Sequence, residues 1–315
     1  MKVTVTSKRH KLKFYLTIIL GALFFVLLGT LLQLVFREEL QKHDLNFKDY
    51  FLPVFSLGCY VMAVYSVYRY YLNAPNIQID RNSITFNKEV YSLSELKYIK
   101  LTGKQPFPYV MGFPMEGAKL QFESGVTKFL FDDMYANYWE LKTFLKQVVV
   151  DKKEHMLAES PVLSEREIEA EDYSVYKGAQ LTSFRGITLW GFVGFIAWIA
   201  VSKKADSDAL VFFAVLSSIW FFFHSWLMHF FKVSESFFVV KNHNFFWVSK
   251  NYRISNIKEI VFETRPKMPN CLRVITRDFR TNMYPAGTLR DKTWAELKRK
   301  LEHQGVKVRS EIYMG

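Results

Sequence analysis

The feature that most constrains this chain is a run of 23 residues, Phe14–Phe36, without a single charged side chain. A helix of about 20 apolar residues is long enough to cross the hydrocarbon core of a bilayer. A second apolar run, Phe51–Leu72, follows a short polar loop and is interrupted only by Arg69 near its end. We therefore predict a transmembrane hairpin over residues 14–72.

The same organisation recurs in the second half of the chain. The apolar runs Gly186–Ser202 and Ala209–Phe231 predict a second transmembrane hairpin. A stretch of ordinary mixed composition follows each hairpin. The expected domains are a basic N-terminus at 1–13, a hairpin at 14–72, a first β-rich module at 73–150, an acidic connector at 151–183, a second hairpin at 184–231 and a basic β-rich module at 232–315.

The two modules also align with each other. At an offset of 161, the segment YSLSELKYIKL (residues 91–101) matches YRISNIKEIVF (residues 252–262). At an offset of 156, NYWELKTFL (residues 137–145) matches TWAELKRKL (residues 293–301). The difference of five predicts a longer loop in the first copy, at Gly103–Gly117. A period near 160 residues is typical of a duplicated domain rather than of a solenoid.

The first module begins with alternating apolar and polar residues, the pattern of half-buried strands. Residues 77–90 show this alternation around the turn residues Asp80-Arg81-Asn82. Further strands are expected at residues 96–101, 119–123 and 127–131, and in the second module at residues 237–240, 245–248, 257–262, 272–276 and 281–284.

The last element of each module has apolar residues spaced by three and four, the helical period. Asn137 with Glu140, and Thr293 with Glu296, would cap these helices, and Gly305 would end the second one. The predicted fold class is α+β: four transmembrane helices as two hairpins, each followed by a small β-barrel or sandwich that a C-terminal helix caps.

The strand order, the two matched segments and the terminal helices resemble bacterial pleckstrin-homology-like (PH-like) domains. The resemblance covers both modules, and such domains often sit beside paired transmembrane helices in bacterial membrane proteins. It implies a binding or scaffolding fold. It implies no catalytic residue, because the shared pattern is a hydrophobic one.

The net charge of +12 is unevenly distributed. Residues 1–13 carry five basic and no acidic side chains, and residues 232–315 carry 17 basic and 8 acidic ones. By the positive-inside rule the N-terminus is cytoplasmic, and an even number of spans puts both modules and the C-terminus in the cytoplasm of a bacterial inner membrane. A cleaved signal peptide is disfavoured, because the first apolar run is too long and no small-x-small site follows it.

The first candidate site is a surface for an anionic partner. Its members are basic residues of the second module: Arg265, Lys267, Arg273, Arg277, Arg280, Arg290 and Lys292. Each cation near an anionic leaflet contributes about 1 kcal/mol of attraction. A solvated basic face is the alternative, and nucleic acid is disfavoured because aromatic residues are not interleaved in a recognised pattern.

Two other features carry weaker hypotheses. His224 and His229 lie in the predicted fourth span, where ionisable groups mark functional sites; five residues apart, they do not share a helix face, which favours packing over metal, haem or proton transfer. The acidic connector is expected to be a solvated helix or tether. The alternative is that it lies on the basic second module and competes with an anionic partner.

The sequence offers no catalytic motif: no Gly-rich phosphate loop, no G-x-S-x-G and no H-E-x-x-H. Cys59 and Cys271 make no disulfide framework. We predict no enzyme, no cofactor and no metal. The favoured function is a membrane-anchored scaffold or adaptor for a protein partner or an anionic lipid surface, and a homo-oligomer is compatible with it.

Two alternatives remain from the sequence. In a sensor–effector, the β-rich domains detect a signal and the spans oligomerise or disrupt the membrane. A transporter ranks last, because it requires polar or broken helices near the membrane midplane.

Overall fold

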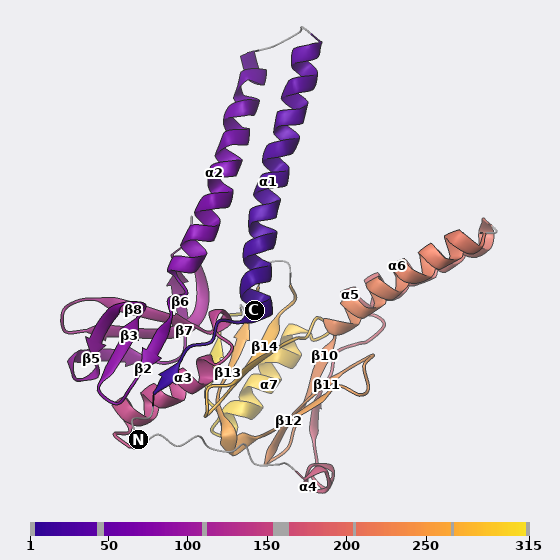
Figure 1. Ribbon diagram of the computed structural model, residues 1–315. Helices are drawn as coiled ribbons and strands as arrows, with labels where there is room; N and C mark the ends of the chain where they lie inside the picture. The colour runs from indigo at the N-terminus through magenta and orange to yellow at the C-terminus, as the bar shows by residue number, and fades with distance from the viewer. Residues whose placement is uncertain are drawn as a thin grey trace. The chain divides into compact units, whose positions relative to one another are not determined.

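The computed structural model describes residues 4–42, 47–108, 112–153, 164–203, 206–265 and 268–312. The chain divides into two compact units, Met1–Ala158 and Glu159–Gly315. Each unit is α+β and contains a pair of long apolar helices and small, largely antiparallel sheets (Figure 1). Among the described residues, these sheets do not close into a barrel.

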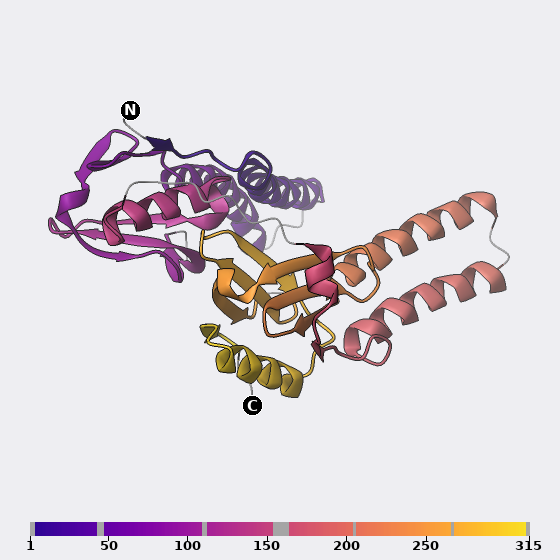
Figure 2. The same cartoon turned by 90° about the horizontal axis from the view of Figure 1, so that it is seen from below.

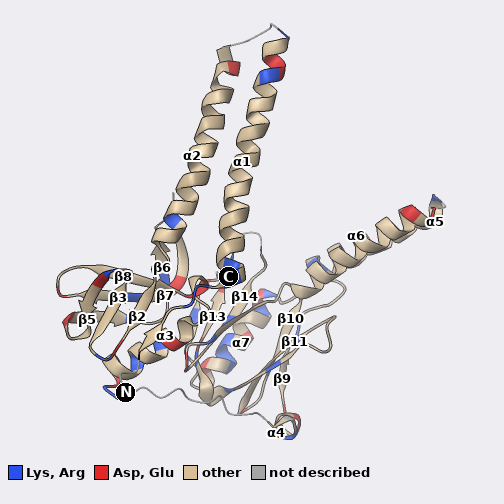
Figure 3. Cartoon of the chain, in the orientation of Figure 1, with Lys and Arg blue, Asp and Glu red and all other residues tan. Residues whose placement is uncertain are grey.

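In the part of the chain that the structure describes, four helices are long and apolar enough to cross a membrane, as the sequence predicts. They are α1 (Lys11–Gln41), α2 (Phe51–Leu72), α5 (Phe184–Ser202) and α6 (Ser207–Trp226). Figure 3 shows that charged residues on these helices gather toward their ends. At 1.5 Å per residue, α5 and α6 are each about 30 Å long, close to the thickness of a hydrocarbon core.

The helices α1 and α2 pack through small and polar residues. The hydroxyl of Ser56 is buried and donates to the carbonyl of Gly29 at 2.8 Å. A Cβ at Gly29 would lie 3.0 Å from the Tyr60 ring and 3.1 Å from the Ser56 carbonyl. Glycine therefore permits the close approach of the two helices, as in other apolar helix pairs.

The helices α5 and α6 lie side by side (Figure 2). The indole N–H of Trp220 donates to the carbonyl of Thr188 at 3.2 Å, and its ring lies 4.4 Å from that of Phe192. Aromatic packing thus replaces the small residues of the first pair.

The first unit contains two sheets. The first has the order β1-β2-β3-β4, formed by Val5–Thr6, Ile77–Ile79, Ser83–Phe86 and Glu89–Ser92. In the second sheet β7 (Phe113–Phe122) pairs with β5 (Leu96–Lys100), β6 (Lys104–Phe107) and β8 (Thr127–Phe131). The helix α3 (Tyr138–Leu145) follows, with Asn137 at its N-cap position as predicted. The Asn137 side chain does not cap the helix: its Oδ1 accepts from the N–H of Lys8, and its amide donates to the Glu140 carboxylate.

The second unit repeats this plan. Its first sheet has the order β9-β10-β11-β12, formed by Ser174–Tyr176, His229–Val233, Phe237–Asn242 and Ser249–Arg253. Its second sheet has the order β15-β14-β13-β16, formed by Thr281–Pro285, Cys271–Thr276, Ile257–Glu263 and Val308–Ser310. The helix α7 (Asp291–His303) buries Trp294, Leu297 and Leu301 in the core of the unit.

Local details match as well. Short 3-10 turns, Leu93–Glu95 and Ile254–Asn256, lie 161 residues apart. The N–H of Leu93 donates to the carbonyl of Asn82, and the N–H of Ile254 donates to that of Ser236, both at 2.8 Å. The two units therefore share most of their element order and the geometry of this turn. Among the described residues, β6 has no counterpart in the second unit, and α4 and the parallel strand β16 have none in the first.

Each helical hairpin is inserted between two neighbouring antiparallel strands. In the first unit, β1 precedes α1 and β2 follows α2, and these strands pair with Thr6 opposite Gln78. In the second unit, β9 precedes α5 and β10 follows α6, with Tyr176 opposite Phe231. Each hairpin thus occupies the position of a β-turn, and two short chain segments join it to its sheet.

The structure corrects the predicted loop Gly103–Gly117. Lys104–Phe107 and the start of β7 pair as a β-hairpin, with Phe107 opposite Phe113. Phe107 is fully buried and packs against Tyr70 and Phe131. The prolines and glycines of this segment suggested a loop, but the buried side chains of Phe107 and Met115 make it part of the sheet.

The fourth apolar run, predicted to span to Phe231, ends earlier. The helix α6 ends at Trp226, and His229–Val233 forms β10. Both edges of β10 are hydrogen-bonded, and Phe231 and Val233 lie in the core. Apolar composition alone does not separate the end of a span from a buried strand.

Three smaller predictions also change. Residues 245–248 form a loop, and the strand begins at Ser249. The helix α7 begins at Asp291, two residues before the predicted cap at Thr293. The predicted connector contributes α4 (Glu165–Glu169) and β9 to the second unit, whereas its residues 154–163 lie outside the described residues.

Candidate functional site

The base of the second hairpin is joined closely to its sheets. The carbonyl of Leu227, just after α6, accepts from the N–H of Gly287 at 2.9 Å, and Met228 forms a bridge with Ala286. A Cβ at Gly287 would contact Arg185 at the start of α5. We call this end of the unit the hairpin-proximal end, and the opposite end of its strands the hairpin-distal end.

Part of the predicted basic surface lies at the hairpin-proximal end. Arg265 follows β13 in the segment that leads to Asn270, whose carbonyl accepts from the N–H of Ala286. Arg290 and Lys292 lie at the start of α7 and are exposed. Lys267 lies outside the described residues.

Arg277 and Arg280 lie at the other end. They belong to the turn between β14 and β15, at the hairpin-distal end, and both are exposed. A strand of six residues separates them from the proximal group by about 20 Å. The seven predicted residues therefore do not form one surface.

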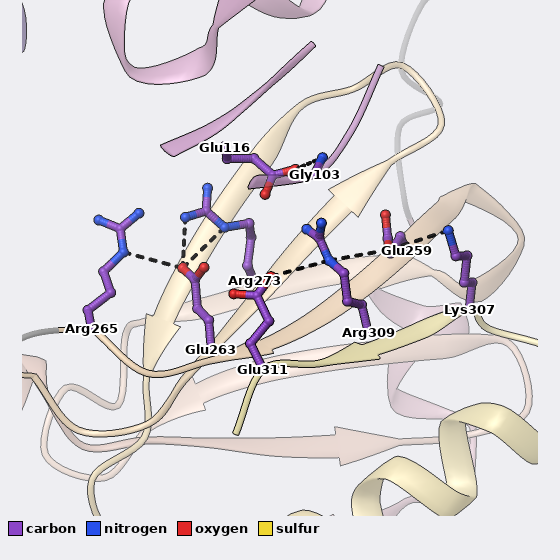
Figure 4. Close-up of polar contacts among 9 residues, drawn as sticks. All are labelled: Gly103, Glu116, Glu259, Glu263, Arg265, Arg273, Lys307, Arg309 and Glu311. Atoms are coloured by element: carbon purple, nitrogen blue, oxygen red, sulfur yellow. Dashed lines mark hydrogen bonds and ion pairs between the residues drawn. The ribbon is translucent and has the colours of Figure 1, made fainter. Parts of the chain in front are cut away.

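Arg273 is not on a surface at all. Its side chain is buried, and its guanidinium Nη2 lies 2.7 Å from the Glu263 carboxylate (Figure 4). Glu263 is fully buried and also lies 3.3 Å from the Nε of Arg265. Burial of a carboxylate requires such compensation. Arg273 therefore neutralises a buried carboxylate, and the prediction that it belongs to a surface for an anionic partner is wrong.

Two other buried carboxylates also have cationic partners. In the second unit, Glu259 lies 3.5 Å from both Lys307 and Arg309. In the first unit, the ammonium of Lys142 lies 2.5 Å from the carboxylate of Asp132, and both side chains are buried.

The two histidines of the predicted fourth span lie in different elements. His224 is in the last turn of α6 and stacks on Trp220 at 4.3 Å. His229 begins β10, and its Nδ1 lies 3.0 Å from the carbonyl of Pro285. Burial lowers the pKa of His229, so the ring is neutral at pH 7. Packing, rather than chemistry, accounts for both positions.

A third histidine, His243, lies in the same region. Its Nε2 lies 3.1 Å from the hydroxyl of Thr288. Burial, followed by the charges of Lys177 and His229, lowers the pKa of His243 to about 4. Among the described residues, no group of three or more His, Cys, Asp or Glu side chains is placed to hold a metal ion.

The acidic segment 165–173 lies on the second module, which the sequence offered only as an alternative. Glu167 forms an ion pair with Arg253 at 2.8 Å, and Ile168 packs on Phe237. Glu171 accepts from the N–H of Ser236 at 3.2 Å, and hydrogen bonding to the Ser234 and Ser236 side chains lowers the pKa of Glu171. The segment covers the hairpin-distal end of β11 and β12.

The first unit has a hollow of about 340 Å³ beside the turn between β2 and β3, which contains Arg81 and Asn82, and the 3-10 turn at Leu93. Arg81 and Lys152 supply positive charge to its lining, and Ser92 and Ser94 supply hydroxyl groups. The two hydroxyls lie 2.8 Å apart. This combination suits a small anion. The net charge of the first module, +1 from nine basic and eight acidic residues, gives no indication of it.

Sequence reasoning missed a further feature, a loop over residues 243–248 in which Phe246 and Trp247 are exposed. The apolar residues of this segment predict a strand over residues 245–248, as stated above. The clue was their position, immediately after an asparagine-rich turn, Asn242-His243-Asn244.

No protein-family model matches this chain, and no curated protein matches it.

Proposed function

We propose that this chain is an integral protein of the bacterial inner membrane, in which two cytoplasmic PH-like modules act as a membrane-anchored scaffold or adaptor. The modules bind an anionic lipid surface or a protein partner. The two copies arose by duplication, which their shared element order and the matched turns at Leu93 and Ile254 support.

The observation that carries this proposal is the insertion of each helical hairpin between adjacent strands. A hairpin in the membrane would hold its sheet against the bilayer surface, because only two short segments connect them. The PH-like assignment draws support from the four-stranded meander, the following strands β13–β15 and the C-terminal helix α7.

The hairpin-proximal cations give the second module its lipid-facing charge. Arg265, Arg290 and Lys292 lie at the end that would face the leaflet, whereas Arg277 and Arg280 would point away from it. Each proximal cation would contribute about 1 kcal/mol of attraction to anionic head groups.

The test compares two variants that each lose two charges. Arg290→Gln with Lys292→Gln removes proximal charge, and Arg277→Gln with Arg280→Gln removes distal charge. Protein extracted in native-membrane particles is analysed by mass spectrometry for retained lipids and proteins. Two charges at about 1 kcal/mol each correspond to roughly thirtyfold, so we expect the proximal variant to retain roughly thirtyfold less anionic lipid than the wild type and the distal variant to match the wild type.

Equal retention by both variants would refute the lipid-binding surface. A protein partner lost only from the distal variant would assign the scaffold role to the hairpin-distal end instead.

A further inference from the structure

The loop between β11 and β12 has no counterpart in the first unit. There, β3 and β4 are joined by the two-residue turn Asn87-Lys88, with Asn87 at a φ of 56°. In the second unit the connection is residues 243–248, which we call the aromatic loop. It contains Phe245, Phe246 and Trp247 in succession.

Asn242 fixes the aromatic loop to the base of the second hairpin. Its buried side-chain amide donates to the carbonyl of Ser225 in the last turn of α6, at 2.7 Å. Its Oδ1 accepts from the N–H groups of Asn244 and Phe245, both at 3.0 Å. Asn244 in turn donates to the Ser225 hydroxyl at 2.7 Å. The position of the loop beside α6 is thus set by hydrogen bonds.

Phe245 packs directly on α6. Its ring lies 5.8 Å from that of Phe222 and 6.3 Å from that of Phe221. Phe222 precedes the end of α6 at Trp226 by four residues, which is about 6 Å along the helix axis. The loop therefore lies beside the last turn of the helix rather than beyond its end.

The tip of the loop is exposed. Phe246 is 83% exposed and Trp247 is 63% exposed, and Trp247 stacks on Phe245 at 5.2 Å. Phe222 and Phe223 of α6 are also exposed, so the tip extends an aromatic surface of the helix. Soluble proteins seldom expose contiguous apolar surface of this kind.

We propose that the aromatic loop inserts Phe246 and Trp247 into the interfacial region of the bilayer, beside the end of α6. This inference rests on the proposed membrane insertion of α5 and α6. The bilayer is the partner because the tip is continuous with the helix surface that lipid would cover. Aromatic rings are favoured at the membrane–water interface, where the exposed Lys250 just after the loop can reach head groups.

Such a loop fixes the tilt of the second module. Because Asn242 and Asn244 join the loop to α6, a bilayer contact at the tip would add a second attachment point beside the helix ends. The first unit, with its two-residue turn, has no equivalent contact at this connection.

The test uses single cysteines labelled with the fluorophore NBD in vesicles that contain a phosphatidylcholine with a nitroxide at acyl carbon 5. The background is the full chain with Cys59→Ala and Cys271→Ala. Phe246→Cys reports on the loop, Ile219→Cys on exposed α6, and Glu302→Cys on the exposed end of α7. We expect quenching at position 246 to be at least threefold stronger than at position 302.

The controls separate two failures. Quenching at 219 with none at 246 would overturn the loop proposal and leave the membrane protein intact. No quenching at either position would overturn the proposed membrane insertion itself. A blue-shifted but unquenched signal at 246 would identify a second protein copy as the partner, which also overturns the proposal.

Discussion

At the residue scale, the second unit holds its charges in two different ways. Arg277 and Arg280 are solvated at a turn, whereas Arg273 lies opposite Met283 within the sheet and is buried against Glu263. Sequence alone could not separate them, because alternation along β14 predicts which residues share a face but not which face has a carboxylate beneath it. The pairing of Glu263 with Cys271 supplies that information.

Substitution of Arg273 should destabilise the second unit. Arg273→Met leaves the Glu263 carboxylate buried with less compensation, which costs about 3 kcal/mol. The midpoint of denaturant unfolding in detergent should fall accordingly, while Arg277→Met should leave it unchanged. Addition of Glu263→Leu to Arg273→Met should restore most of the loss. Equal midpoints for the two single variants would contradict the structural role of Arg273.

The histidines at the hairpin base predict a pH dependence of stability. The pKa of His243 is about 4 in the folded state and about 6.5 when unfolded. The unfolded chain therefore binds more protons between these values, and stability is lost as the pH falls from 6.5 to 4. The contribution of His243 is on the order of 2 kcal/mol after allowance for its partial exposure.

The unfolding midpoint measured at pH 7 and pH 4.5 tests this dependence. His243→Phe should reduce the difference between the two midpoints, and His229 should account for part of what remains. His303, exposed on α7, provides the control, since His303→Phe should leave the difference as it is in the wild type. If His243→Phe had the same difference between its midpoints at pH 7 and pH 4.5 as the wild type, protonation of His243 would not contribute to the pH dependence of stability.

At the element scale, periodicity predicted most strands and both terminal helices, because each buries one face. Periodicity failed where pairing with a neighbouring strand determines whether a segment becomes a strand. Residues 104–107 became a strand because β7 is long enough to pair with it, and His229–Val233 became β10 because β9 and β11 lie on both sides. The sequence predicts strands over parts of β7 and β11, but not their pairing with residues 104–107 and 229–233.

The acidic segment should be held on the second module by its apolar contact more than by its charges. Ile168 is buried against Phe237 and Val239, and its burial is worth about 2 kcal/mol. Ile168→Asp should release the segment and accelerate tryptic cleavage after Arg166 roughly tenfold. The exposed neighbour Glu169→Gln should be cleaved at the wild-type rate. A wild-type rate for Ile168→Asp would mean that the contact does not hold the segment.

At the scale of the whole molecule, strand pairing constrains the topology independently of charge. Because β1 pairs with β2 and β9 pairs with β10, each hairpin must return the chain to the side that it left. Both units then share one side of the membrane if both hairpins cross it. The even number of predicted spans also places both units on one side of the membrane. Only the prediction that this side is the cytoplasm depends on the five cations of residues 1–13.

Cysteine labelling tests both parts of this topology in the Cys59→Ala, Cys271→Ala background. Glu39→Cys and Asp206→Cys report on the hairpin tips, and Ser94→Cys and Glu302→Cys report on the two units. In intact spheroplasts, a membrane-impermeant maleimide should label both tips and spare both units, and permeabilisation should expose all four. Labelling of the two units but not of the tips would place both units on the outer side of the membrane. That result would still agree with the strand pairing, because the units would share one side. Labelling of one unit and one tip would contradict the common side, because strand pairing allows no hairpin to end opposite its start.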